Sequence, residues 1–178
     1  MRISHLSHAV AAALTASIVL SAPASSQEAP ALPGGASSLQ ETYQDWNVAC
    51  QSTPKIVCAT SQQQTQQNGQ RILAIELRKG DADAVSGNLV LPFGLLLDAG
   101  AALQIDEGQP REPLRFSTCV PAGCVVPLSF DAETVAALRA GTALRIKAQD
   151  TDKKEVTLSV SLKGLAAALD RLKVLVGA

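Results

Sequence analysis

Residues 46–58, which read Trp-Asn-Val-Ala-Cys-Gln-Ser-Thr-Pro-Lys-Ile-Val-Cys, decide the fold of this 178-residue chain. Trp46, Val48 and Cys50 stand at every second position of this stretch. Alternation of this kind is the period of a β-strand with one buried face. A turn centred on Pro54 follows, and a second strand begins directly after it. The two strands therefore form a hairpin in which Cys50 stands opposite Cys58.

The first 24 residues have the plan of a secretory signal peptide. Arg2 is followed by an apolar run from Ala9 to Leu20, and Ala22-Pro23-Ala24 supplies the small residues of a cleavage site. The run is about 12 residues long, whereas a helix needs roughly 20 to cross a bilayer. We therefore expect cleavage after Ala24, no membrane span, and a protein that is periplasmic, secreted or displayed on the outer surface.

The four cysteines form an even set in a chain with an export signal, which predicts two disulfides. Three pairings are possible. Loop entropy alone favours a long link between Cys50 and Cys119, worth about 4 kcal/mol against roughly 2 to 3 for a short one. Hairpin geometry favours local pairing, because opposed residues lie within bonding range and Pro121 with Gly123 can turn the chain. We expect Cys50 bonded to Cys58 and Cys119 to Cys124. A redox pair is less favoured, since the Cys-x-x-Cys spacing and a strand-to-helix context are absent. A zinc site is less favoured still, since both pairs would have to converge as thiolates in an oxidising compartment.

The composition is that of an aliphatic-cored globule, with 47% hydrophobic and 17% charged residues. The net charge of -1 gives no reason to expect nucleic acid as a partner. Both histidines, His5 and His8, lie in the predicted signal peptide. The exported chain then lacks the commonest general base and transition-metal ligand, and we expect no metal, no cofactor and no catalysis.

The remaining chain divides into a short leader and one domain. Residues 25–42 are small, polar and rich in Pro and Gly, which predicts a flexible N-terminal tether. Residues 43–178 form a single β-rich domain. Apolar residues recur there at every second position, in the sets Leu73, Ile75, Leu77; Ala101, Leu103, Ile105; Leu114, Phe116, Thr118; Cys124, Val126, Leu128, Phe130; Leu144, Ile146, Ala148; and Val156, Leu158, Val160, Leu162. Seven or eight short strands between turn signals predict a mainly β fold, an antiparallel β-sandwich or partly closed barrel.

Two short helices interrupt the strands. Asp131 can cap a helix over residues 132–140, which Gly141 ends. A second helix over residues 164–174 carries an apolar stripe of Leu165, Ala168, Leu169 and Leu172, which can cover an open end of the core.

The order of these features resembles the invasion-associated locus B family of exported bacterial proteins. The resemblance rests on Trp46 to Cys50, on Leu91-Pro92-Phe93-Gly94, on Cys119 with Gly123-Cys124, and on Ser161-Leu162-Lys163-Gly164. It implies an export signal, a compact β-rich fold and a link to host-cell entry, with no agreed reaction. We therefore expect an exported non-catalytic binding or envelope protein. Its partner would be an unidentified protein in the envelope or on a host surface.

An alternative function is that of a periplasmic hydrolase that uses acidic turn residues. Asp106 and Glu107, together with Asp98, could supply the two carboxylates that split a glycosidic bond. They stand beside Gly108 and Gly100, in turns where acids are usually solvated. The chain also has few aromatic residues with which to stack a sugar.

A glutamine-rich hairpin is the candidate interaction site. Residues 61–67 lead into Asn68-Gly69, a strong two-residue turn signal. The turn sets Gln64 opposite Leu73 and Gln62 opposite Ile75. The return strand is therefore amphipathic, whereas the outgoing strand is polar on both faces. We expect this hairpin to project or to form a sheet edge, and an open edge can accept a partner's strand. The alternative is a solvated hairpin with no special role. The candidate interaction residues are Gln62, Gln64, Thr65 and Gln66.

Overall fold

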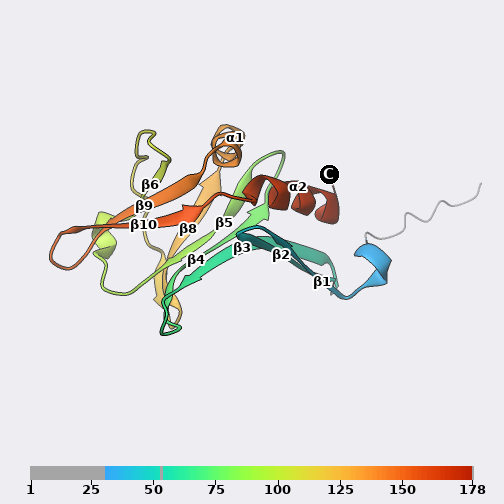
Figure 1. Cartoon of the computed structure of the whole chain (residues 1–178), viewed down its shortest axis with the longest axis horizontal. Coiled ribbons are helices and arrows are strands. Elements are labelled where there is room, and N and C mark those ends of the chain that lie inside the picture. Colours follow the sequence, from blue (N-terminus) through green and yellow to red (C-terminus); the bar gives the residue numbers. More distant parts are fainter. Residues whose placement is uncertain (1–30, 53, 178) are drawn as a thin grey trace, which may run out of the picture.

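The computed structural model of the protein describes residues 31–52 and 54–177 (Figure 1). The predicted signal peptide and residues 25–30 of the predicted tether lie outside these ranges. The elements in chain order are β1 (Ser38–Tyr43), β2 (Trp46–Ser52), β3 (Ile56–Thr65), β4 (Arg71–Lys79), β5 (Val85–Leu91), β6 (Ala102–Ile105), β7 (Thr118–Val120), β8 (Gly123–Phe130), α1 (Ala132–Ala140), β9 (Ala143–Gln149), β10 (Glu155–Ser161) and α2 (Leu165–Val176), with single 3-10 turns at Pro33–Gly35 and Leu97–Ala99.

The strands form two antiparallel sheets. The larger has seven strands in the order β1-β2-β3-β4-β5-β8-β7, and the smaller has the order β10-β9-β6. Figure 1 shows α2 and the small sheet on the same side of the large sheet. Apolar side chains alternate along the strands, so one face of the large sheet packs against both elements in a single core. The predicted mainly β, antiparallel fold with two helices is confirmed. It is a sandwich of two sheets and not a closed barrel, because β1 and β7 remain edges of the large sheet in the described part of the chain.

The predicted tether is wrong at its C-terminal boundary. Residues 38–43 form β1, which pairs with β2 from Ser38 opposite Gln51 to Tyr43 opposite Trp46. Leu32, further upstream, is only 2% exposed and belongs to the core. The Arg171 side chain on α2 holds β1 by two bonds of 2.7 and 2.8 Å to Glu41, and these bonds lower the pKa of the Glu41 carboxyl. The Pro and Gly residues of the segment precede β1. The half-buried positions of the strand are Leu39, Glu41 and Tyr43, so a charged residue interrupts the apolar alternation that would have revealed it.

A strand predicted at Leu114, Phe116 and Thr118 is also wrong over most of its length. Leu114 makes only an isolated bridge to Ala101, and regular pairing begins at Thr118. Pro110 and Pro113 precede it, and proline has no N–H to donate to a ladder.

Both helices are confirmed. The Asp131 carboxylate caps α1 by accepting from the backbone N–H of Thr134 at 2.8 Å, and the N–H of Gly141 bonds to the Ala137 carbonyl at the other end. The sequence suggests that α2 covers an open end of the core. The helix instead lies along β2 and β3. Gly164 permits this approach, since its φ is +88° and a β-carbon there would collide with the Tyr43 carbonyl.

The buried position of Leu32 predicts that the segment before β1 belongs to the folded domain. Leu32→Ala should lower the free energy of unfolding by about 2 to 5 kcal/mol, because it removes buried methyl groups and leaves a cavity. Urea denaturation measures this loss. Leu97→Ala, at a leucine that is 44% exposed, is the matched control and should change stability little. Equal small losses in the two variants would show that residues 31–37 belong to the tether and not to the folded domain.

Candidate functional site

The cysteines are joined in two cross-strand pairs. Cys50 is bonded to Cys58 across β2 and β3, with α-carbons 4.1 Å apart, and Cys119 to Cys124 across β7 and β8, with α-carbons 3.9 Å apart. In both cases the partners are directly opposed in the register of the hairpin. This is the local pairing that the turn geometry predicts.

The glutamine-rich strand is not an edge, and this part of the prediction is wrong. The register is as expected, with Gln62 opposite Ile75 and Gln64 opposite Leu73. However, β3 lies between β2 and β4, and Gln62 is only 6% exposed. Thr65 and Gln66 are exposed at the end of the hairpin. A partner's strand therefore has no open edge to join along β3.

The glutamines instead bond to the backbone of β10. The Gln62 side-chain amide donates to the Ser161 carbonyl at 2.9 Å and accepts from the Ser161 N–H at 3.2 Å. Gln64 donates to the Ser159 carbonyl at 2.6 Å, and the Trp46 indole N–H donates to the Ser161 carbonyl at 2.9 Å. These side chains connect the two sheets and are unavailable to a partner.

The acidic residues of the hydrolase alternative serve the fold. The Asp106 carboxylate accepts from the Thr142 hydroxyl at 2.6 Å and from the N–H groups of Thr142 and Ala143 at 3.0 and 2.9 Å. These bonds, the Thr142 hydroxyl first, lower the pKa of Asp106. Glu107 forms an ion pair with Arg145 at 2.6 Å. Asp98 lies before β6 and Asp106 after it, so about 13 Å of strand separates them. Asp98 and Asp106 therefore stand at opposite ends of β6, while Asp106 and Glu107 are both engaged in bonds within the fold.

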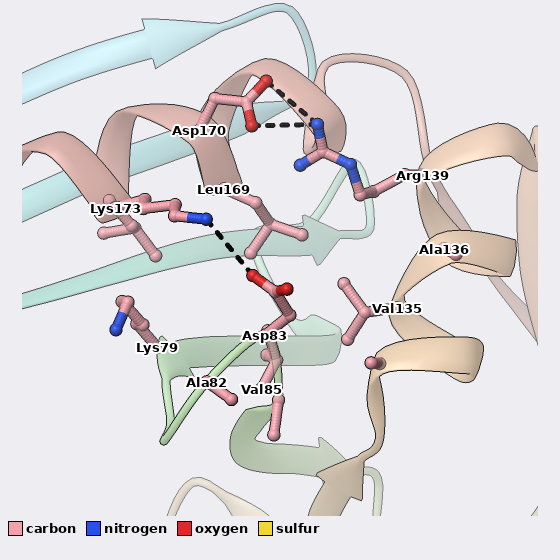
Figure 2. Close-up of a pocket in the computed structure, with 13 residues that line it drawn as sticks. Lys79, Ala82, Asp83, Val85, Val135, Ala136, Arg139, Leu169, Asp170 and Lys173 are labelled. Carbon is pink, nitrogen blue, oxygen red and sulfur yellow. Dashed lines mark hydrogen bonds and ion pairs between the residues drawn. The ribbon is translucent and has the colours of Figure 1, made fainter. Parts of the chain in front are cut away.

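A cleft opens between α1, α2 and the β4–β5 loop, residues 80–84, and has a volume of about 330 Å³ (Figure 2). Its floor is apolar and consists of Val85, Val135, Leu169 and Leu172. Figure 2 shows Val135 on α1 and Leu169 on α2 pointing into the space between the elements. Its size falls in the usual range for ligand sites, about 300 to 1,000 Å³.

The rim of the cleft is charged. Lys173 on α2 pairs with Asp83 of the β4–β5 loop at 3.2 Å, and Arg139 on α1 pairs with Asp170 on α2 at 2.9 Å. Lys79, at the end of β4, adds a third cation. Exposed pairs of this kind contribute about 0 to 1 kcal/mol each, so a ligand can replace either pair at low cost.

Sequence reasoning did not find this cleft. Its charged residues come from β4, the β4–β5 loop, α1 and α2, which are distant in the sequence. The one local signal is the charged stretch from Lys79 to Asp83 around Gly80, which reads simply as a solvated turn. Within residues 31–52 and 54–177, no group of three or more His, Cys, Asp or Glu side chains is arranged to hold a metal. The described helices include none long and apolar enough to cross a membrane.

Comparison with known proteins gives one consistent family. Residues 46–173 match the family model described as invasion associated locus B (IalB) protein. The chain is 49% identical over 150 residues to an invasion protein B homolog of Brucella abortus, covering 83% of this chain and 86% of the relative. It is 40% identical over 146 residues to invasion protein B of Bartonella bacilliformis, covering 79% and 78%. A crystal structure of invasion associated protein B from Bartonella henselae superposes with a TM-score of 0.72 at 38% identity, over 77% of this chain and 97% of that one.

The structural role of Asp106 predicts a pH-dependent stability. Its pKa in the folded chain lies below the ordinary value of 3.8, so its contribution is present above pH 3.8 and is lost as the pH falls through the lower, folded value. Asp106→Asn should therefore be less stable than the wild type at pH 7, and the difference should shrink towards pH 2. Urea denaturation across this range measures both.

Asp98→Asn is the control for this measurement, because Asp98 is exposed in the turn Leu97–Ala99. It should be about as stable as the wild type at pH 7. A difference between wild type and Asp106→Asn that stays constant down to pH 2 would contradict the structural role.

Proposed function

The chain belongs to the invasion associated locus B family, and from this premise we propose that it is an exported, non-catalytic protein that binds a protein partner in the cleft between α1, α2 and the β4–β5 loop. The partner lies in the bacterial envelope or on a host surface. The names of the relatives support a role in host-cell entry, which is part of the proposal.

The observation that carries the proposal is an apolar floor enclosed by weak ion pairs. Leu169 and Val135 form an apolar surface, on which an apolar side chain of a partner can pack away from water. Lys173 and Asp83 present both signs of charge at the rim, and each can pair with a charge on the partner. An apolar centre within a polar rim is the usual anatomy of a protein interface.

Two features favour an exported binding protein over the hydrolase. The carboxylates of Asp106 and Glu107 are engaged in bonds that position β9, and neither lines the cleft. The two disulfides and the signal-like segment at residues 1–24 suit an oxidising compartment, the periplasm or the space beyond it.

A single side chain on α1 tests the cleft. Ala136 lines it and is exposed, so Ala136→Trp should fill the cleft without disturbing the core. Ala137 is also exposed but does not line the cleft, and Ala137→Trp is the matched control. Cross-linked affinity capture from envelope and host-membrane extracts should recover at least several-fold less partner with Ala136→Trp than with Ala137→Trp.

Thermal unfolding of both variants should first establish that they fold as the wild type does. Equal recovery with the two tryptophan variants would remove the cleft as the binding site. Turnover of a glycoside or ester substrate by the wild type, abolished in Asp106→Asn at a pH where that variant is folded, would instead establish the hydrolase.

A further inference from the structure

A second hollow lies at the end of the large sheet where the β3–β4 and β7–β8 turns meet. We call it the terminal hollow. It has a volume of about 550 Å³ and is lined by Gln70, Arg71, Pro92, Phe93, Pro121, Ala122 and Gly123. Two motifs of the sequence, Leu91-Pro92-Phe93-Gly94 and the disulfide-bonded turn from Cys119 to Cys124, are thus brought together although about 25 residues separate them along the chain.

Backbone geometry holds one wall of the terminal hollow in place. Gly123 has a φ of +135°, and a β-carbon there would collide with the Leu91 carbonyl. Only glycine therefore lets β8 begin directly beside the end of β5, where Leu91 is paired with Cys124. The Cys119–Cys124 disulfide then closes the turn that carries Pro121 and Ala122. The hollow is formed before any ligand arrives.

The apolar residues of the terminal hollow do not serve the core. Phe93 is 62% exposed, and Pro121 and Ala122 are exposed beside it. Val120, the adjacent residue of β7, is 40% exposed. Exposed apolar residues gathered around one hollow suit a contact with another molecule, because burying them there would stabilise the complex.

One cation stands in this apolar setting. Arg71, the first residue of β4, is the single charged residue among those that line the terminal hollow. Its guanidinium makes no ion pair within the described ranges 31–52 and 54–177. A guanidinium that lines the same hollow as an aromatic ring, without a carboxylate partner, fits an anionic group, and its planar fork fits a carboxylate in particular.

We propose that the terminal hollow binds the C-terminus of a partner polypeptide, with the last apolar side chain against Phe93 and Pro121 and the free carboxylate on Arg71. A C-terminal residue carries an apolar side chain and a carboxylate on the same carbon, which matches a hollow of this size with one cation. This site is separate from the cleft between α1 and α2, and its existence does not depend on the proposed function of that cleft.

A matched pair of peptides tests the terminal hollow. An N-acetylated pentapeptide that ends in phenylalanine, with a free carboxylate or with a C-terminal amide, is titrated into the ¹⁵N-labelled exported chain. The carboxylate form should shift the amide signals of Arg71, Phe93, Ala122 and Gly123. The amide form should bind at least about tenfold more weakly, since it loses a charge-assisted hydrogen bond.

Variants separate the two parts of the contact. Arg71→Gln should bring the two peptides to the same weak affinity, and Phe93→Ser should weaken both. Arg78→Gln, at an arginine of the same strand that already pairs with Glu76 at 2.8 Å, and Val174→Ser, at a valine that is 71% exposed on α2, are the controls and should change neither. Ala136→Trp should also leave peptide binding unchanged, which separates this site from the cleft.

Three results would overturn the proposal. The first is the absence of peptide-induced shifts at millimolar concentration. The second is equal affinity of the carboxylate and amide forms for the wild type. The third is binding to phosphatidylglycerol vesicles that Phe93→Ser abolishes, without any peptide binding, which would assign the terminal hollow to a membrane surface.

Discussion

The Gln62 side chain joins the two sheets by exchanging a pair of hydrogen bonds with the backbone of Ser161. A primary amide carries the donor and the acceptor of a peptide group, so Gln62 completes the edge of β10 as a neighbouring strand would. The Trp46 indole adds a third bond to the same residue, and the Ser161 hydroxyl donates to Asp45. Each bond of this kind contributes about 1 kcal/mol, and leaving one of these partly buried groups unpaired costs about 1 to 3 kcal/mol. The small sheet can therefore lie on the large one only where these bonds form.

The position of α2 follows from these side-chain bonds to Ser161, which we call the seam between the two sheets. Ser161 ends β10, and the chain passes through Leu162 and Lys163 to Gly164, which turns into α2 against the Tyr43 carbonyl. A helix fixed at its first turn must lie along β2 and β3, where its apolar stripe is buried and Arg171 reaches Glu41 on β1. This placement opposes α2 to α1, and the cleft of Figure 2 is the space that remains between them. A side-chain seam inside the sandwich thus determines the geometry of the proposed binding surface.

Local patterns made much of the fold predictable from the sequence. The strands with large aliphatic residues at every second position, such as Leu73 to Leu77, needed no information beyond their own period, and Asp131 with Gly141 delimited α1. The prediction for the glutamines of β3 was wrong because a strand that is polar on both faces reads as solvated. The partner of Gln62, Ser161, lies 99 residues away in the sequence. The same limit hid the cleft, since Lys79, Arg139 and Lys173 meet only after three distant elements have packed. The terminal hollow was partly predictable, because both of its motifs can be read from the sequence. Their contact depends on the pairing of β5 with β8, and β5 was not among the expected strands.

Hydrogen exchange at Ser161 tests the seam most directly. Ser161 and Thr157 lie on the same strand with their N–H groups on the same side by the alternation of β10, and only the Ser161 N–H reaches a glutamine oxygen among the described residues. The Ser161 amide should exchange at least about tenfold more slowly than the Thr157 amide, a difference equal to one hydrogen bond of about 1.4 kcal/mol. Gln62→Met, which keeps the length of the side chain but removes the amide, should bring Ser161 to the rate of Thr157 while Val160, bonded within the small sheet, stays slower than both. Equal rates for Ser161 and Thr157 in the wild type, or a Ser161 rate that Gln62→Met leaves unchanged, would contradict the central role of this interaction.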